Sequence, residues 1–338
     1  MMKSEADSKP HLIRELGRGC TKKAYLYEQN GEKKIILQAV RRSKKRSFLW
    51  QVRKEANITR KLPQMRCDIR TVYVVRKCGR WEVSAHYVEG EPLNAELFGS
   101  LSEKGKKSLL ADFAEFLLTL HVMRVSMLDE RYADATDAPL SPLYLLGALG
   151  YKIFCLKKTW LSLRNPQKNP YATRKFARKK AKLCRAFAFS AGEVQRLEKT
   201  LRAVCAQPRL FGYVGVCFGD FFGSNFLYDK ESGRLAALDF TCQYKGNIYE
   251  EFVSIYMWMG KEFTQKLLHC YNALAAKRNV RLPSCPAYPL ELDCAMVQHL
   301  VALRLFQMMP QSPANKEKVL DILHELYPDT TPASAASA

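Results

Sequence analysis

Hydrophobic and polar positions change their period along the chain, and this change predicts two kinds of structure. Up to about residue 90, short runs of β-branched and aromatic residues alternate with turn signals such as Asn30-Gly31, which predicts a five-stranded antiparallel sheet. One stretch within this region, from about Phe48 to Leu62, is helical in character and stops at Pro63. We therefore expect a compact lobe of five strands with one helix between the third strand and the last pair.

From Leu101 onward the apolar residues recur with a helical period, apart from one hairpin near residues 217–240. The clearest stripe comprises Leu109, Leu110, Phe113, Phe116, Leu117 and Leu120. The fold class is therefore α+β, with a small antiparallel-sheet lobe and a mainly helical lobe. The expected boundaries are a tail at 1–11, the small lobe at 12–90, the helical lobe at 91–327 and a disordered tail at 328–338.

Length and cysteine content add limits to this picture. The chain has 338 residues, 47% of them hydrophobic, which is enough for one large or two modest domains with cores of their own. Its eleven cysteines form neither a C-x-x-C pair nor a Cys/His cluster with zinc spacing, so we expect reduced thiols. No export signal is recognisable, and no apolar run reaches the roughly 18 residues of a spanning helix. These features predict a cytoplasmic protein.

Charge points to an anionic partner. The chain carries 54 Lys and Arg against 33 Asp and Glu, a formal net charge of +21. From Lys152 to Arg185 there are basic residues but no Asp or Glu. Such a surface attracts nucleic acid, an anionic membrane face or an acidic substrate. Nucleic acid is the least favoured of these, because stacking aromatics are not interleaved with the basic residues.

The candidate chemistry lies in residues 217–240, CFGDFFGSNFLYDKESGRLAALDF. Asn225 leads into an apolar strand, a turn follows, and a second apolar strand ends at Asp239. Because antiparallel pairing returns the chain, we expect Asp220, Asn225 and Asp239 to converge. These oxygen donors suit Mg²⁺, and a further aspartate beside the cation can accept a proton from an attacking hydroxyl. The alternative is a plain hairpin whose carboxylates are solvated.

This pattern resembles the catalytic hairpin of the protein-kinase-like superfamily, in particular its aminoglycoside phosphotransferase and choline kinase branch, with lipopolysaccharide core kinases as a related possibility. In that branch the motif is H-G-D-x-x-x-x-N, a β-hairpin and I-D-F. The resemblance implies a two-lobed kinase-like fold and ATP and Mg²⁺ as cofactors. It also implies that Asp220 is the catalytic base and that Asn225 and Asp239 are metal ligands. Two residues depart from the pattern: Phe218 replaces His, and Thr241 replaces a Gly found in many members.

The same resemblance implies a nucleotide site in the small lobe. LGRGCTKKAYLYE is similar to a glycine-rich loop whose backbone covers the phosphates, with Gly17 and Gly19 permitting close approach. Glu55 has the helical context of the glutamate that pairs with a lysine on the third strand. Tyr87 and Val88, at the end of the small lobe, complete the expected nucleotide-binding residues.

The lysine itself is missing from the third strand. The apolar hexad Ile35–Val40 contains one polar residue, Gln38, which we expect to face the nucleotide but which brings no charge. Lys22, Lys23 and Arg41 are the candidates to supply that charge. The gap is also the main argument for a catalytically weak kinase-like module that binds nucleotide or an anionic partner. The intact aspartates and asparagine of the hairpin favour an active enzyme.

Two further residues match the family pattern. His121 ends an L-x-x-L-H sequence on an apolar helix, and we expect it to be a hydrogen-bonded core residue. Glu251, in GNIYEEFVSIY, occupies the second acidic position of a family stretch, where it is expected to brace the catalytic loop.

The expected acceptor is a hydroxyl of a small molecule or glycan. A basic helical insertion at about 141–195 is read either as core helices with a solvated face or as an interfacial segment on anionic lipid. A net charge of +21 opposes a polycationic aminoglycoside. It favours an anionic or lipid-linked acceptor, such as a lipopolysaccharide core sugar, with peripheral contact at the inner face of the cell membrane. Five basic residues are assigned to the acceptor side: Arg174, Lys175, Arg178, Lys179 and Lys180.

Overall fold

The structure is a computed structural model, and it describes residues 11–18, 22–41, 45–77, 80–123, 174–207, 209–210, 213–282 and 285–328. The chain forms two compact units. The first comprises 1–119, 123–158 and 218–244; the second comprises 120–122, 159–217 and 245–338. The predicted interfacial segment before residue 174 and most of both predicted tails lie outside the described residues, and the predicted lobe boundary near residue 90 stays a prediction.

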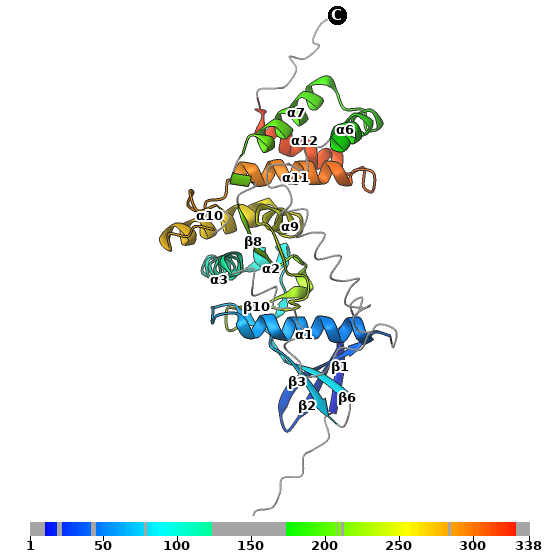
Figure 1. Ribbon diagram of the computed structural model, residues 1–338, viewed down its shortest axis with the longest axis vertical. Coiled ribbons are helices and arrows are strands. Elements are labelled where there is room, and N and C mark those ends of the chain that lie inside the picture. Colours follow the sequence, from blue (N-terminus) through cyan, green and yellow to red (C-terminus); the bar gives the residue numbers. More distant parts are fainter. Residues whose placement is uncertain are drawn as a thin grey trace, which may run out of the picture. The chain divides into compact units, whose positions relative to one another are not determined.

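The first unit contains the predicted five-stranded sheet with its helix (Figure 1). The strands are antiparallel in the order β1-β2-β3-β6-β5, and a left-handed turn at Asn30 and Gly31, with φ of 54° and 80°, joins the second strand to the third. These elements are β1 (His11–Arg18), β2 (Lys22–Gln29), β3 (Glu32–Ala39), α1 (Lys45–Lys61), β5 (Val72–Lys77) and β6 (Arg80–His86).

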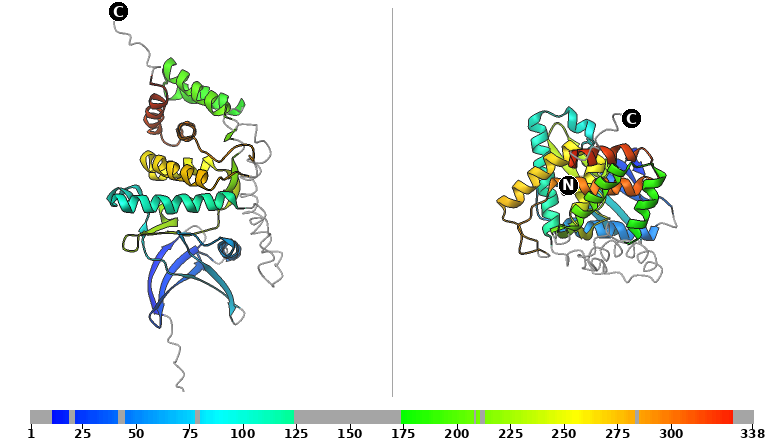
Figure 2. Two further views of the ribbon diagram at one scale, coloured as in Figure 1. Left: turned by 90° about the vertical axis from the view of Figure 1, so that its left-hand side faces the viewer. Right: turned by 90° about the horizontal axis from the view of Figure 1, so that it is seen from above.

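Helix α1 covers one face of this sheet, and Figure 2 (left) shows it end-on against the curved strands. Side chains alternate between the two faces of a strand, so Ile35 and Leu37 of β3 share the face that meets the helix. They are buried with Phe48, Trp50 and Val52 of α1, and all five side chains are 5% exposed or less. This packing fixes which residues of β2 and β3 share the face of the sheet that α1 covers.

A second, four-stranded sheet of the first unit carries the candidate chemistry. Its order is β4-β10-β9-β7, and β4 is parallel to β10, so the strand that follows α1 pairs directly with the predicted hairpin. The elements are β4 (Asp68–Ile69), β7 (Glu91–Pro92), α2 (Ala95–Ser100), α3 (Glu103–Val122), the short 3-10 helix η3 (Gly223–Asn225), β9 (Phe226–Asp229) and β10 (Arg234–Ala237).

The second unit is mainly helical, as predicted. Helix α11 is its centre, because most of its residues are buried and it packs against α7, α9 and α12. The elements are α6 (Arg174–Ala186), α7 (Ala191–Cys205), β8 (Val214–Cys217), β11 (Tyr244–Asn247), α9 (Tyr249–Met259), α10 (Lys261–Lys277), α11 (Cys294–Met308) and α12 (Asn315–Leu326). Within the described part of the chain, no helix has both the length and the apolar character needed to cross a membrane.

Candidate active site

The structure contains the predicted hairpin, and its strand pairing brings the start of the first strand and the end of the second together. Strands β9 and β10 pair from Asp229 opposite Arg234 to Phe226 opposite Ala237. Beyond the last pair, the Leu238 N–H donates to the Asn225 carbonyl at 2.8 Å. Asp239 therefore follows a residue that is bonded directly to Asn225, as the sequence predicted.

Asn225 also fixes Asp220. Its side-chain amide donates to the Asp220 carbonyl oxygen at 2.9 Å and to Asp220 Oδ2 at 3.1 Å. The loop between them is closed by the Phe222 N–H on the Asp220 carbonyl and the Asn225 N–H on the Phe222 carbonyl. The Asp220 carboxylate is thus held by its own loop, a suitable arrangement for a base that must meet a hydroxyl in a defined direction.

Asp239 is held in an unusual backbone conformation. Its φ is +60°, in the left-handed region that residues with a Cβ rarely adopt. Thr241 stabilises it: its N–H donates to the Asp239 carbonyl at 2.8 Å and its hydroxyl to Asp239 Oδ1 at 2.7 Å. Such strain persists only where neighbouring contacts enforce it. Thr241, one of the two departures from the family pattern, supplies those contacts here.

Asp239 also forms part of a chain of buried and half-buried charges. Lys22 Nζ lies 2.7 Å from Asp239 Oδ1 and 3.2 Å from Glu55 Oε2. The other oxygen of Glu55 accepts from Arg70 Nη2 at 3.2 Å, and the Glu55 side chain is fully buried. Burial alone would raise the pKa of the Asp239 carboxyl, but the Lys22 ammonium, the hydrogen bonds from Lys22 and Thr241 and the Arg70 charge outweigh it and lower that pKa.

These residues fit a magnesium site. An ionised Asp239 and the amide oxygen of Asn225 are hard oxygen donors. Among the residues that the structure describes, no group of three His, Cys, Asp or Glu side chains is placed to enclose a metal. That small donor set suits Mg²⁺, which is commonly held by one or two carboxylates together with substrate phosphates.

The structure distinguishes between the candidate cations and does not place Gln38 with Glu55. Gln38 is exposed, and it alternates with Leu37, whose side chain is buried against α1, so Gln38 belongs to the opposite face of the sheet. Lys23 is paired with Gln38 and takes that face as well. Arg41 is exposed. Gln38 therefore does not share the face that carries Glu55, and its contact with phosphates stays a prediction. Of the three candidate cations, Lys22 is the one that meets Glu55.

The other predicted nucleotide residues are placed less tightly. Gly17 lies on β1 beside an irregularity in its pairing with β2, and a Cβ there would meet nothing within 4 Å. Gly19 is outside the described residues. Tyr87 packs against the core of the sheet and α1, and Val88 follows it, half-buried. Their contact with a nucleotide stays a prediction.

A cluster of phenylalanine rings takes the place of the missing histidine. Phe218 has no exposed surface, and its ring centroid lies 5.2 Å from those of Phe226 and Phe240, 5.4 Å from Phe221 and 5.7 Å from Phe116. Residues on both sides of Asp220 and next to Asp239 are therefore anchored in one apolar core. Phe218 thus anchors the loop by ring packing, where the family pattern has a histidine.

Sequence reasoning missed two buried cations of this site. Lys54, next to Glu55 on α1, is 2% exposed and donates to the backbone carbonyls of Thr241 at 2.8 Å and Gln243 at 3.1 Å. Arg70 binds Glu55 as described above. Only the adjacency of Lys54 to Glu55 could have drawn attention to it. Together they tie α1 to the segment that carries Asp239.

In the second unit, His121 is a core residue, as predicted. Its ring nitrogens meet Tyr271 Oη at 2.7 Å and Glu251 Oε2 at 3.2 Å, and all three side chains are buried. Burial raises the pKa of Tyr271 well above its ordinary value, so the phenol stays protonated. Glu251 bonds to His121; its bracing of the catalytic loop stays a prediction.

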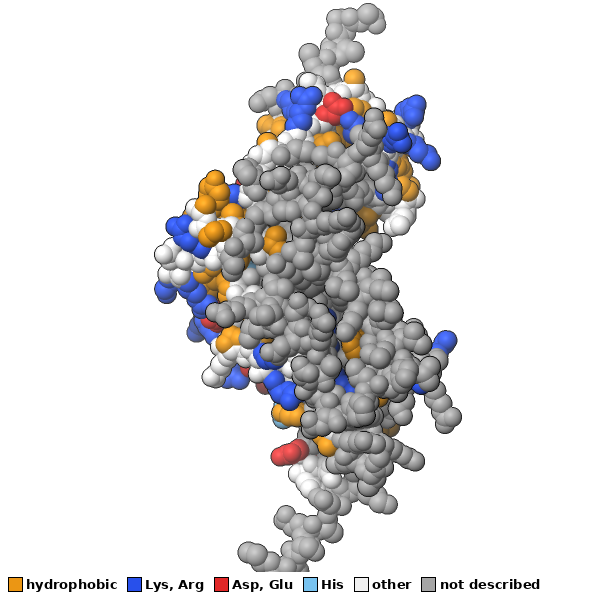
Figure 3. All heavy atoms as spheres, viewed as in Figure 1, with side chains coloured by type: hydrophobic (Ala, Val, Ile, Leu, Met, Phe, Trp, Pro, Cys, Tyr) orange, Lys and Arg blue, Asp and Glu red, His pale blue; other side chains and the backbone are white. Residues whose placement is uncertain are grey.

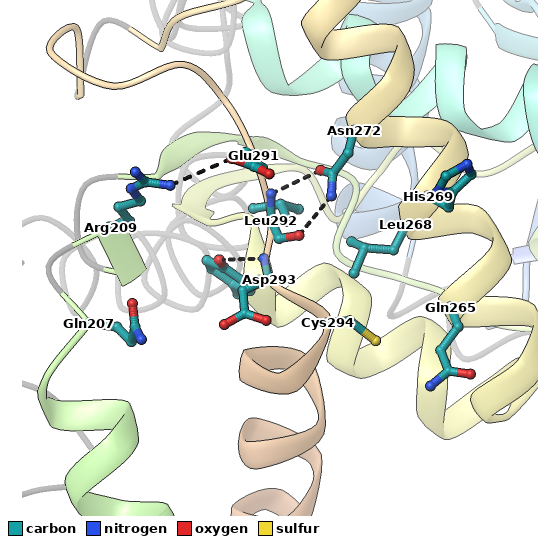
Figure 4. Close-up of a pocket in the computed structure, with 11 residues that line it drawn as sticks. Gln207, Arg209, Gln265, Leu268, His269, Asn272, Glu291, Leu292, Asp293 and Cys294 are labelled. Atoms are coloured by element: carbon teal, nitrogen blue, oxygen red, sulfur yellow. Dashed lines mark hydrogen bonds and ion pairs between the residues drawn. The ribbon is translucent and has the colours of Figure 1, made fainter. Parts of the chain in front are cut away.

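The second unit also contains a polar pocket of about 600 Å³, which no sequence motif indicated. It lies between α10 and the segment leading into α11 (Figure 4). Asn272 holds Leu292 by both its N–H and its carbonyl, at 2.9 and 2.8 Å, and Arg209 lies 3.8 Å from Glu291. The lining includes both acidic and basic side chains, so its charge does not favour one class of ligand.

The predicted basic block is partly engaged within its own unit. Lys and Arg side chains gather over α6 (Figure 3). Arg178 and Lys179 are exposed, but Lys179 Nζ bonds to the Gln307 carbonyl at 3.3 Å, and Lys180 pairs with Glu198 at 2.5 Å. Arg174 and Lys175 belong to the first turn of α6, and their side chains lie outside what the structure describes.

Fold and site together define a kinase-like phosphotransferase. A family model described as "Phosphotransferase enzyme family" matches residues 80–282, which is more than half of the chain and includes the whole hairpin. The chain belongs to this family. The predicted enzyme class and superfamily are therefore confirmed. No curated protein matches the chain.

Solved structures confirm the fold. The GDP and kanamycin complex of an APH(2″) enzyme is similar over 97% of this chain and 96% of its own, with 16% identity and a TM-score of 0.52. The GDP complex of wild-type aminoglycoside 2′-phosphotransferase-IIIa is 15% identical over 97% and 95%, with a TM-score of 0.51. At this level of identity the likeness extends to the two-lobed fold, which was the predicted one.

Proposed function

We propose that this protein is an ATP- and Mg²⁺-dependent kinase that transfers a phosphoryl group to a hydroxyl of a small molecule or glycan. One observation carries the proposal. Asp220 and Asn225 are bonded to each other, and the same hairpin places Asp239, with a lowered pKa, beside an ammonium group. A plain hairpin with solvated turn carboxylates would not need a strained aspartate that is linked through Lys22 to a buried glutamate of α1.

Each residue has a distinct role in this proposal. Asp220 accepts the proton of the attacking hydroxyl, and Asn225 keeps its carboxylate in place. Asp239 and Asn225 would hold Mg²⁺, which neutralises charge on the phosphates when it is bound. The phenylalanine cluster around Phe218 keeps both aspartate segments at a fixed separation, because a close-packed core resists compression.

The donor and acceptor classes follow from the relatives and from charge. Structural neighbours with bound GDP and kanamycin support a purine nucleotide donor and a small polar acceptor. A net charge of +21 and the basic helix α6 favour an anionic acceptor over a polycation. We propose an anionic or lipid-linked glycan, with a lipopolysaccharide core sugar as the favoured case, met at the inner membrane face.

Labelled nucleotide tests the proposal. The full-length protein is incubated with γ-labelled ATP or GTP, with and without Mg²⁺, against panels of acidic glycans, lipopolysaccharide cores and aminoglycosides. We expect Mg²⁺-dependent label transfer to an anionic glycan, and transfer only to aminoglycosides would refute the acceptor class. If nucleotide bound but no label moved to any acceptor or to water, the catalytically weak binding module would replace the kinase.

A further inference from the structure

We propose that Lys22, on strand β2, is the phosphate-binding lysine of this kinase. We also propose that in the nucleotide-free protein the same ammonium group takes the position of the cation at Asp239. The inference rests on the proposed function, because it assigns the phosphate contact that function requires. It concerns only residues of the first unit. It explains how the protein can lack the lysine that the family pattern has on the third strand.

The sheet places Lys22 where a lysine of β3 would otherwise be needed. Residues directly opposite each other in an antiparallel pair project to the same face, and Lys22 is paired with Ala39. Ala39 packs against the core formed with α1, so its face is the one that carries Glu55. Of the four β3 residues that alternate onto this face, Ile35, Leu37 and Ala39 are apolar, and Lys33 lies at the opposite end of the strand from Ala39, where it pairs with Glu89. The cation at this level of the sheet is therefore Lys22 on β2, and not a residue of β3.

The contacts of Lys22 make it an exchangeable counter-ion. Its Nζ lies 2.7 Å from Asp239 Oδ1, and this carboxylate is the proposed metal ligand. An ammonium at that distance and a divalent cation on the same carboxylate repel each other, so Lys22 must leave Asp239 when metal binds. Glu55 Oε2 also lies 3.2 Å from Lys22 Nζ, and Arg70 holds Glu55 through its other oxygen, so this second partner of Lys22 stays in place.

This exchange couples metal to nucleotide. In the free protein Lys22 compensates the charge of Asp239, which would otherwise be unpaired in a half-buried site. Nucleotide phosphates offer the ammonium a new partner and release Asp239. Metal and nucleotide should therefore bind with positive coupling, and metal alone should bind weakly.

The first test measures metal alone on the full-length protein. Mn²⁺ is titrated by electron paramagnetic resonance in the absence of nucleotide, with Mg²⁺ as competitor. We expect Lys22→Met to bind Mn²⁺ about tenfold more tightly than wild type, because the competing ammonium is gone. Lys33→Met is the matched control, because it removes an exposed lysine of β3 that is paired with Glu89. It should leave the Mn²⁺ affinity unchanged. Equal or weaker Mn²⁺ binding by Lys22→Met would overturn the exchange.

The second test returns the lysine to β3. Lys22→Ala should weaken Mg-ATP binding, measured by calorimetry, by about tenfold or more. The double variant Lys22→Ala/Ala39→Lys should recover affinity to within about threefold of wild type, since residue 39 faces the same point of the sheet. If the double variant bound Mg-ATP as weakly as Lys22→Ala, the proposal that Lys22 replaces a lysine of β3 would be refuted. Neither test requires turnover, so a protein that transferred no phosphoryl group would refute the proposed function but not these binding results.

Discussion

Phe218 gives a prediction that separates packing from catalysis. The residue stands where the family motif has histidine, yet its ring is fully buried among four other phenylalanines. Restoring the motif with Phe218→His should therefore destabilise the first unit. It should also bring no gain in the transfer rate, because the site is already shaped around the phenyl ring.

The magnitude follows from burial. Removing a fully buried phenyl ring loses about 1.5–3 kcal/mol of apolar burial. An imidazole that finds no hydrogen-bond partner among these rings adds about 1–3 kcal/mol for its unpaired polar atoms. The expected loss is roughly 2.5–6 kcal/mol for Phe218→His. Phe218→Leu, which stays apolar, is the matched control and should cost about 1–2 kcal/mol.

Hydrogen exchange read by mass spectrometry on peptides from residues 226–237 reports this loss locally, without assuming that both units unfold together. We expect faster exchange in the order wild type, Phe218→Leu, Phe218→His. A histidine variant as protected as wild type would show that the cavity offers the imidazole a partner, and the packing account of Phe218 would be wrong.

Three further predictions concern the charged groups. Asp239→Ala should abolish Mg²⁺-dependent nucleotide binding by calorimetry, and unchanged magnesium dependence would exclude Asp239 as the ligand. Folding lowers the pKa of Asp239 from 3.8, so its ion pair stabilises the protein above that pH and the contribution is lost as the pH falls below it. The midpoint of urea unfolding should therefore depend less on pH in the acid range for Asp239→Asn than for wild type. Parallel pH profiles of the two proteins would contradict this. Changing the exposed α6 residues Arg178, Lys182 and Arg185 to Gln should weaken binding to anionic vesicles by roughly 1 kcal/mol per cation, while equal binding would exclude α6 as the docking surface. The matched control changes three lysines of α10: Lys261, Lys266 and Lys277.

The hairpin could be predicted from sequence because its determinants are local. Asn225, an apolar strand, the turn at 229–233 and a second strand ending in Asp239 follow each other within 24 residues, so one register brings the ends together. The five-stranded sheet was predictable for the same reason. Alternation and turn residues define each strand without reference to distant parts of the chain.

The charge network could not be predicted, because it depends on which face of the sheet meets α1. We expected Gln38 to face the nucleotide because it is the one polar residue of an apolar run. The same alternation that buries Leu37 exposes Gln38. Choosing Lys22 over Lys23 required that face to be known. The contacts of Lys54 and Arg70 join segments more than a dozen residues apart in sequence, and no local pattern specifies them.

Asp220→Asn tests the central claim most directly. The measurement pairs calorimetric affinity for Mg-ATP with the single-turnover rate of transfer from γ-labelled ATP to the acceptor found in the glycan screen, with Asp229→Asn in the turn of the same hairpin as the matched control. The account predicts an affinity within about twofold of wild type and a rate lowered by about 10²–10⁴ for Asp220→Asn, since only the base is lost, and no change for Asp229→Asn. Wild-type transfer by Asp220→Asn, or an equal loss in both variants, would contradict it.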